Sequence, residues 1–156
     1  TYTGTGTGTN TVYGGLGEDF LDYSAATEAV VLHGNDDTDN ITGGDGNDTI
    51  ASGAHADLLT GGNGTDTFIF FSRFESYSAY TDRITDFVNA LSSTSHDIID
   101  ISLLGFTGIQ AGSGSGSVLG YTDNGTDTII SSETGDFKLI LSNIAVSLSD
   151  ADFIFS

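Results

Sequence analysis

The chain has 156 residues, which is enough for one domain or for a repeat array with one small cap. Three Lys and Arg residues stand against 22 Asp and Glu residues, so the formal net charge is −19. This balance excludes a nucleic-acid-binding surface, and self-repulsion of this size predicts that cations take part in folding. The absence of Cys excludes disulfides, and the lack of an apolar run of eighteen residues predicts no membrane span.

The first thirteen residues alternate Thr with Gly and then end in Asn10-Thr11-Val12-Tyr13. Asn10 and Val12 lie nine residues before Asp19 and Leu21, so residues 1–13 are predicted to form a degenerate first turn of a repeat. A flexible Gly/Thr linker at the start of the chain is an equally good interpretation.

A nine-residue repeat follows, with the pattern Gly-Gly-x-Gly-x-Asp-x-U-x, in which U is a large apolar residue. The complete copies are residues 14–22, 43–51 and 61–69, and looser copies in the same register are residues 34–42 and 52–60. The sixth-position acids are Asp39, Asp48, Asp57 and Asp66, and the apolar residues two places later are Ile41, Ile50, Leu59 and Phe68. Residues 23–33 lack the glycines, and twenty residues instead of eighteen separate Asp19 from Asp39. We therefore expect a two-residue bulge there, with a missing or weakened site.

Each residue type in the repeat has a physical reason. The glycines allow turns that a Cβ would forbid, and they let carbonyl oxygens converge on one point, which the Asp closes with a carboxylate. The x-U-x triplet is a short strand whose U side chain points inward. Two repeats make one coil, so turns eighteen residues apart stack, and calcium, which takes six to eight oxygen ligands, fits between them. The pattern predicts a parallel β-roll that binds several calcium ions.

The pattern changes after Phe68. Residues 67–71 are predicted to be a strand that leaves the roll, and residues 83–88, 97–101, 137–141 and 153–155 are further strand candidates. Asn124-Gly125 predicts a tight hairpin between residues 118–121 and 126–130. We therefore expect an all-β chain with a β-roll over residues 1–69 and a C-terminal antiparallel β cap over residues 70–156, continuous with the roll.

The repeats resemble RTX proteins in general, and the downstream half resembles the R-modules of secreted bacterial mannuronan C-5 epimerases. The residues that carry this resemblance are Asp66 to Phe70, Asp82 to Phe87, Asp97 to Ile109 with Leu104-Gly-Phe-Thr-Gly108 at its centre, and Ser149 to Phe155. The resemblance implies a non-catalytic accessory module, linked covalently to a catalytic module or to sister modules. It also implies a protein that is extracellular or at the cell surface, with export by the type I route, and a part in folding, secretion and alginate handling.

The resemblance further implies a ligand set. One turn gives the carbonyls of its second and fourth residues and its Asp, and the facing turn gives the carbonyls of its first and third residues and its Asp. The best site is then Gly44, Gly46 and Asp48 facing Gly61, Asn63 and Asp66, and the second is Asn35, Asp37 and Asp39 facing Ser52, Ala54 and Asp57. Further metal candidates are Gly15, Gly17 and Asp19 of the first repeat and, from downstream motifs, Asp86 and Asp100.

Other interpretations stay open. Alginate-binding R-modules carry basic residues where this chain has Thr126 to Ile130, and four calcium ions would still leave a net charge of about −11, so we expect only weak alginate binding. A calcium-dependent matrix or surface-layer unit that associates head to tail is one alternative. The C-terminal part of an RTX lipase or protease is another.

Overall fold

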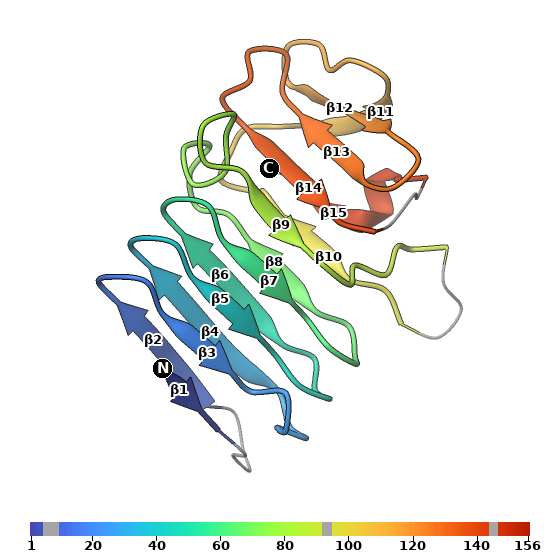
Figure 1. Cartoon of the computed structure of the whole chain (residues 1–156). Coiled ribbons are helices and arrows are strands. Elements are labelled where there is room, and N and C mark those ends of the chain that lie inside the picture. Colours follow the sequence, from blue (N-terminus) through green and yellow to red (C-terminus); the bar gives the residue numbers. More distant parts are fainter. Residues whose placement is uncertain (5–9, 92–94, 144–146) are drawn as a thin grey trace.

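The computed structural model describes residues 1–4, 10–91, 95–143 and 147–156, and it shows two facing β-sheets wound from one chain (Figure 1). Sheet 1 begins with β1 (Tyr2–Thr3), β3 (Phe20–Asp22), β5 (Asn40–Thr42) and β7 (Leu58–Thr60). Sheet 2 begins with β2 (Asn10–Gly15), β4 (Val30–Asn35), β6 (Thr49–Gly53) and β8 (Thr67–Ile69). The chain alternates between the sheets, and neighbouring strands are parallel, so each pair of strands completes one coil of a parallel β-roll.

The register of the strands confirms the eighteen-residue coil. Asn40 lies opposite Leu58 in sheet 1, and Thr49 lies opposite Thr67 in sheet 2. At the start of sheet 1, Tyr2 lies opposite Leu21, a step of nineteen residues. The step from β2 to β4 and the step from β3 to β5 are each twenty residues, because Val12 lies opposite Leu32 and Phe20 opposite Asn40. The two extra residues therefore lie in the turn 23–29, as the sequence predicts.

The turns between the sheets form two stacks, one on each side of the roll, which we call the first and the second column. The first column contains the turns 14–19, 34–39 and 52–57 and then the loop 70–81, and each of them leads into a strand of sheet 1. The second column contains the turns 23–29, 43–48 and 61–66 and then the segment that follows β9 (Asp82–Ile84), and each of them leads into a strand of sheet 2. Stacked turns are the places where the sequence predicts calcium.

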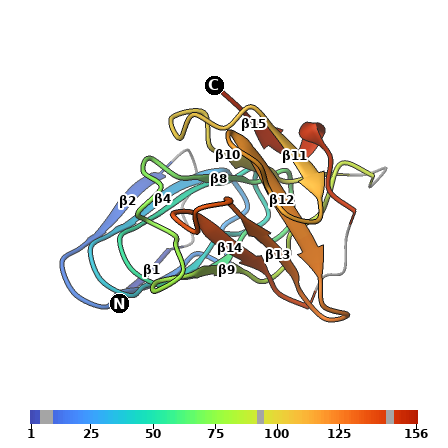
Figure 2. The same cartoon turned by 90° about the horizontal axis from the view of Figure 1, so that it is seen from above.

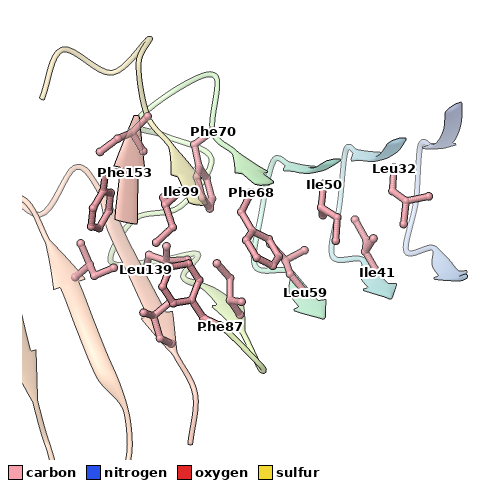
Figure 3. Packing of buried hydrophobic residues seen from close by; sticks show 14 of the residues in the cluster. Leu32, Ile41, Ile50, Leu59, Phe68, Phe70, Phe87, Ile99, Leu139 and Phe153 are labelled. Carbon is pink, nitrogen blue, oxygen red and sulfur yellow. The ribbon is translucent and has the colours of Figure 1, made fainter. Parts of the chain in front are cut away.

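The interior of the roll is a ladder of apolar side chains. Leu21, Ile41, Leu59 and Ile84 come from sheet 1, and Leu32, Ile50, Phe68 and Ile99 come from sheet 2; all are fully buried. Figure 3 shows residues of the two sets pointing toward each other along the roll. Each such side chain contributes about 1.5–3 kcal/mol when it is removed from water. Only one residue of each nonapeptide is needed for this core, so the turn residues are free to bind a ligand.

Parallel pairing continues past the last sequence repeat. β9 pairs with β7, and β10 (Ile98–Asp100) pairs with β8, both in parallel, and β15 (Phe153–Ile154) pairs in parallel with β10. β8 therefore stays in the roll, and the prediction that it leaves is wrong. The prediction of antiparallel pairing is also wrong for β9, β10 and β15. Asp82-Arg83-Ile84 and Asp97-Ile98-Ile99 keep the Asp-x-U triplet, which is enough to extend both sheets after the glycines have ended.

An antiparallel meander covers the end of the roll, as predicted. β12 (Val118–Asp123) pairs with β13 (Thr128–Ser131), and β13 pairs with β14 (Lys138–Leu141), both antiparallel. β14 then lies parallel to β9, so the meander extends sheet 1. β11 (Gly108–Ala111) pairs in parallel with β12, and a short 3₁₀ helix, η1 (Asp150–Asp152), precedes β15. Seen from above, these strands lie across one end of the coils (Figure 2). In the described part of the chain, no helix has the length and apolar character needed to cross a membrane.

One of the three cationic side chains fastens the loop 70–81 to this cap. Arg73 donates from Nε to the Leu104 carbonyl oxygen (2.7 Å) and from Nη1 to Asp136 Oδ2 (3.2 Å). Its guanidinium also lies 4.1 Å from the centre of the Phe106 ring, which is a cation–π contact. The loop therefore joins the last coil of the roll to the cap.

Candidate calcium sites between stacked turns

Four of the five repeat turns use left-handed backbone at their second and fourth positions, and the turn 43–48 is the exception. Gly15, Gly17, Gly53, Gly62 and Gly64 have positive φ there, and so do the non-glycine residues Asn35 (79°), Asp37 (75°) and His55 (85°). A residue with a Cβ adopts this conformation at a cost of about 1–2 kcal/mol. The turn geometry is thus kept even where the sequence pattern is loose, which explains why the imperfect copies still stack.

The sixth-position carboxylates form a hydrogen-bonded ladder in each column. Each Oδ1 accepts the backbone amide of the sixth-position residue one coil earlier. In the first column the amides of Asp19, Asp39 and Asp57 donate to Asp39 (2.8 Å), Asp57 (2.7 Å) and Asp82 (2.8 Å). In the second column the amides of Val30, Asp48 and Asp66 donate to Asp48 (2.9 Å), Asp66 (2.8 Å) and Asp97 (3.0 Å). Val30, the first residue of β4, stands where the other coils have an acid.

The other oxygen of three repeat carboxylates has no hydrogen-bond partner among the described residues. These atoms are Oδ2 of Asp39, Asp57 and Asp66, and each is buried. A buried polar atom without a partner costs about 1–3 kcal/mol, and more when it is charged. A native fold does not leave three of them in one structure without a reason.

Carbonyl oxygens of the next turn face these carboxylates. A Cβ placed on Gly34 would lie 2.3 Å from both Asp39 Oδ2 and the Ser52 carbonyl oxygen. A Cβ placed on Gly43 would lie 2.3 Å from Asp48 Oδ2 and 2.4 Å from the Gly61 carbonyl oxygen. Two acceptors therefore converge on one small space at the first position of the turn. Gly34 and Gly43 cannot be replaced without loss, because a side chain at either position would fill that space.

Asp48 differs from the other repeat acids. Its Oδ2 accepts the amide of Gly44 at 2.6 Å, within its own turn. Gly44 and Gly46 also pack against the irregular turn before them, because a Cβ on Gly44 would lie 2.3 Å from the Ala26 carbonyl oxygen. The structure therefore brings together the residues of both predicted sites, but it leaves unpaired acids at Asp39 and Asp57 in one site and at Asp66 alone in the other.

Burial and neighbouring charge raise the pKa of these carboxylates when no cation is bound. Removal from water raises the pKa of Asp39 to about 6 and that of Asp57 and Asp66 to about 7. The ion pairs of Arg73 and Arg83 go to Asp136 and Asp127 in the cap, outside the turns. No ion pair in the described part of the chain joins a Lys or Arg side chain to Asp39, Asp57 or Asp66.

The donor set fits calcium. Carboxylate and backbone carbonyl oxygens are the ligands that calcium prefers, in flexible arrangements of six to eight. No group of three or more His, Cys, Asp and Glu side chains in the described ranges is arranged to hold a metal without help from the backbone. A calcium ion between these turns would therefore need backbone carbonyl oxygens for a large part of its ligand set.

The remaining sequence candidates lie at the two ends of the columns. Gly15, Gly17 and Asp19 form the outermost turn of the first column, where Gly17 donates to Asp37 Oδ2 (3.1 Å). The carboxylate of Asp86 accepts the amides of Gly61 (3.0 Å) and Gly62 (2.8 Å), so it lies against the last repeat turn of the second column. Asp100 ends β10 on the opposite side of the roll, and its Oδ1 accepts the amide of Ser102 (3.0 Å). Asp86 and Asp100 are thus not brought together.

Two acids of the ladder were not predicted as site residues. Asp82 and Asp97 are both buried and occupy the sixth position of the coil that follows the last repeat. They stand 25 and 31 residues after Asp57 and Asp66 instead of eighteen, so the fixed period misses them. The Asp-x-U triplet, searched without the glycines, would have found both.

A parallel roll of nonapeptide turns lined with buried acids is the architecture of an RTX repeat module. The family model of the RTX calcium-binding nonapeptide repeat matches residues 5–25 and 33–68, in four copies. The comparison with curated protein sequences gives no match.

Two solved structures are similar over most of the chain. The AlgE6R3 subunit of the mannuronan C5-epimerase from Azotobacter vinelandii is 31% identical; the match covers 90% of this chain and 79% of that subunit, with a TM-score of 0.69. The AlgE6R2 subunit of the same epimerase is also 31% identical, over 90% of this chain and 91% of that subunit, with a TM-score of 0.64. The chain belongs to the family of mannuronan C5-epimerase R-modules, and its repeats are calcium-binding RTX repeats.

Proposed function

We propose that this chain is a non-catalytic, calcium-dependent module of a secreted protein, and that it assists the folding and export of a linked catalytic module. The observation that carries the proposal is the buried Oδ2 of Asp39, which has no hydrogen-bond partner among the described residues and lies close to the Ser52 carbonyl oxygen of the next turn. Calcium would remove this repulsion, and it is abundant outside cells and scarce inside them. The module would therefore fold where calcium stabilises it by mass action.

The proposed sites lie between stacked turns. In the first column the oxygens come from Asn35, Asp37 and Asp39 on one turn and from Ser52, Ala54 and Asp57 on the next. In the second column they come from Gly44, Gly46 and Asp48 and from Gly61, Asn63 and Asp66, with Asp86 beside the last of these turns. Calcium supplies the positive charge there, and the chain's own part is to hold the carboxylates in register through the amide ladder.

Calcium removal tests the proposal directly. In excess chelator we expect a weaker β spectrum and a lower melting temperature, and at millimolar calcium a full β spectrum with a cooperative thermal transition at higher temperature. The reason is that metal-free turns keep unpaired buried acceptors, whereas the bound ion satisfies them. Circular dichroism at both conditions, with magnesium at the same ionic strength as the control, makes the measurement. An identical spectrum and melting temperature with and without calcium would contradict the proposal.

Asp39→Asn tests whether the local repulsion at Asp39 Oδ2, and not the overall negative charge of the chain, destabilises the metal-free module. The new side-chain amide replaces Oδ2 and can donate to the Ser52 carbonyl oxygen, so we expect the metal-free module to gain about 1–3 kcal/mol. The same change should reduce the further stabilisation by calcium. Urea unfolding with and without calcium measures both effects. Asp36→Asn, at an exposed position in the same turn, removes the same charge and should leave both nearly unchanged.

We expect any contact with alginate to be weak. The relatives are subunits of a mannuronan epimerase, and this supports a role near that polymer. Alginate is a polyanion, however, and the exposed cation of sheet 1, Arg83, already pairs with Asp127 (3.7 Å). Calcium that bridges the module and the polymer is the contact that the charges permit, and it should be lost in chelator.

A further inference from the structure

A buried carboxylate oxygen without a partner is also found in the last repeat turn of the first column. Asp57 belongs to the final repeat turn of the first column, yet its Oδ2 is buried and unpaired in the described structure, like that of Asp39. The Oδ2 of Asp39 faces the first carbonyl of the turn one coil later. By the same register, the Oδ2 of Asp57 faces the loop 70–81, which has no repeat pattern.

A second carboxylate closes this space from the other side. Asp82 is fully buried at the end of the loop; its Oδ1 accepts the amide of Asp57 (2.8 Å), and its Oδ2 accepts the hydroxyl of Ser52 (3.2 Å). Asp82 therefore holds the same place in the ladder as the repeat acids, although seven additional residues precede it. Ser52 stands where the other turns of the first column have glycine, at Gly14 and Gly34.

The charges around this space are all negative. Burial raises the pKa of Asp57 to about 7, and the charges of Asp39 and Glu75 add to that effect. Glu75 lies in the loop, where its carboxylate accepts the Phe71 amide (2.8 Å), and it lines a hollow of about 250 Å³ together with Gly53 and Ala54 of the turn. Arg73, on the same loop, points to Asp136 in the cap instead.

We propose that Asp57 and Asp82 hold a calcium ion between the turn 52–57 and the loop 70–81, in a junction site that lies outside the sequence repeats. Backbone carbonyls of the turn would complete the ligands, and Glu75 would add negative charge at its rim. The inference rests on the proposed calcium-dependent function and extends it, because this ion would bind the cap to the roll. The link to the cap is direct: the Asp82 amide donates to the Ser76 hydroxyl (2.9 Å), which in turn contacts the Lys138 carbonyl of β14.

Asp82→Asn tests the junction site with little disturbance of the fold. Its remaining oxygen still accepts the Asp57 amide, and its new amide can donate to the Ser52 hydroxyl, so only the charge is lost. We expect native mass spectrometry to show one calcium ion fewer than in the wild type. We also expect calcium to slow chymotrypsin cleavage at the exposed Phe71 and Phe74 about tenfold or more in the wild type, and to give little protection in the variant.

The outcomes separate this inference from the proposed function. A wild-type chain that binds no calcium overturns the function as a whole. A wild type that binds calcium, with the same number of ions and the same loop protection in Asp82→Asn, overturns the junction site alone. Glu28→Gln, at an exposed position in the turn 23–29 of the other column, is the charge-matched control and should behave as the wild type.

Glu75→Gln tests the same site if Asp82→Asn does not fold. It keeps an acceptor for the Phe71 amide and removes one charge near Asp57. The calcium concentration for half-maximal loop protection should then rise at least threefold. An unchanged midpoint would count against the junction site.

Discussion

Gly62→Ala is expected to destabilise the roll strongly, even at saturating calcium. Gly62 has a φ of +102°, which costs an L residue about 1–2 kcal/mol, and the new Cβ would lie 2.2 Å from the Gly44 carbonyl oxygen of the turn one coil earlier. Neither turn can move away without breaking the sheet register, and overpacking of this kind adds about 1–3 kcal/mol. Urea unfolding followed by circular dichroism would measure a total loss of about 3 kcal/mol or more.

Gly15→Ala is the matched control for this substitution. Gly15 occupies the same second position and has a φ of +112°, but a Cβ added to it at the open end of the roll would meet no atom within 4 Å. The substitution should therefore cost only the backbone contribution of about 1–2 kcal/mol. Equal losses of unfolding free energy in the two variants would mean that contact between stacked turns is not the reason why this position requires glycine.

The metal-free module should be more stable at pH 5 than at pH 7.5. Burial raises the pKa of Asp39 to about 6 and that of Asp57 and Asp66 to about 7, against 3.8 for a solvated Asp. Between about pH 4 and pH 7 the folded chain therefore binds protons that the unfolded chain does not, so folding stability decreases as pH rises through this window. Thermal unfolding of calcium-free protein at pH 5, 6 and 7.5 should give melting temperatures that fall in that order.

Calcium should reverse this order, because protons compete with the ion for the same carboxylates. At saturating calcium the higher melting temperature is expected at pH 7.5. Asp39→Asn should flatten the metal-free pH dependence, whereas Asp36→Asn should keep it. A calcium-free wild type that is less stable at pH 5 than at pH 7.5 would show that the buried acids are not those that control the fold.

The regular part of the fold could be predicted in detail from the sequence. The period of nine fixes the turn, the inward residue and the stacking distance at once, and Ile41, Ile50, Leu59 and Phe68 are all fully buried as expected. Even the defect in the turn 23–29 could be predicted, because two extra residues change the register by a countable amount.

The continuation of the roll into β9 and β10 could not be predicted by the same period. The connections before them are longer by seven and thirteen residues than in the repeats, and their glycines are absent. Only the triplets at Asp82 and Asp97 mark them. The parallel pairing of β14 with β9 and of β11 with β12 is a further case, because both contacts join segments that the sequence does not relate.

The residues of the candidate site could be predicted from the sequence. Which of their carboxylate oxygens are hydrogen-bonded and which are unpaired could not. Sequence reasoning placed the Asp48 site first, since both of its repeats are complete. The structure shows that Asp48 already accepts the Gly44 amide, while Asp39 and Asp57 keep an unpaired oxygen. This difference depends on how the turn 23–29 packs against its neighbour, and a repeat pattern carries no information on that.

The eighteen-residue register also sets the unit in which this module could grow or shrink during evolution. Removing residues 43–60 would join Thr42 to Gly61. This junction repeats the existing Thr42-Gly43 and Thr60-Gly61 junctions, so every remaining turn would still stack on a turn of the same kind. Adding a copy of the same segment would lengthen the roll by one coil with no new loop. Changes of any other length would have to occur where the register is already irregular, in the turn 23–29 or in the loops that lead to β9 and β10. Length variation among related modules should therefore come in whole coils, while the cap and its two long connections stay fixed.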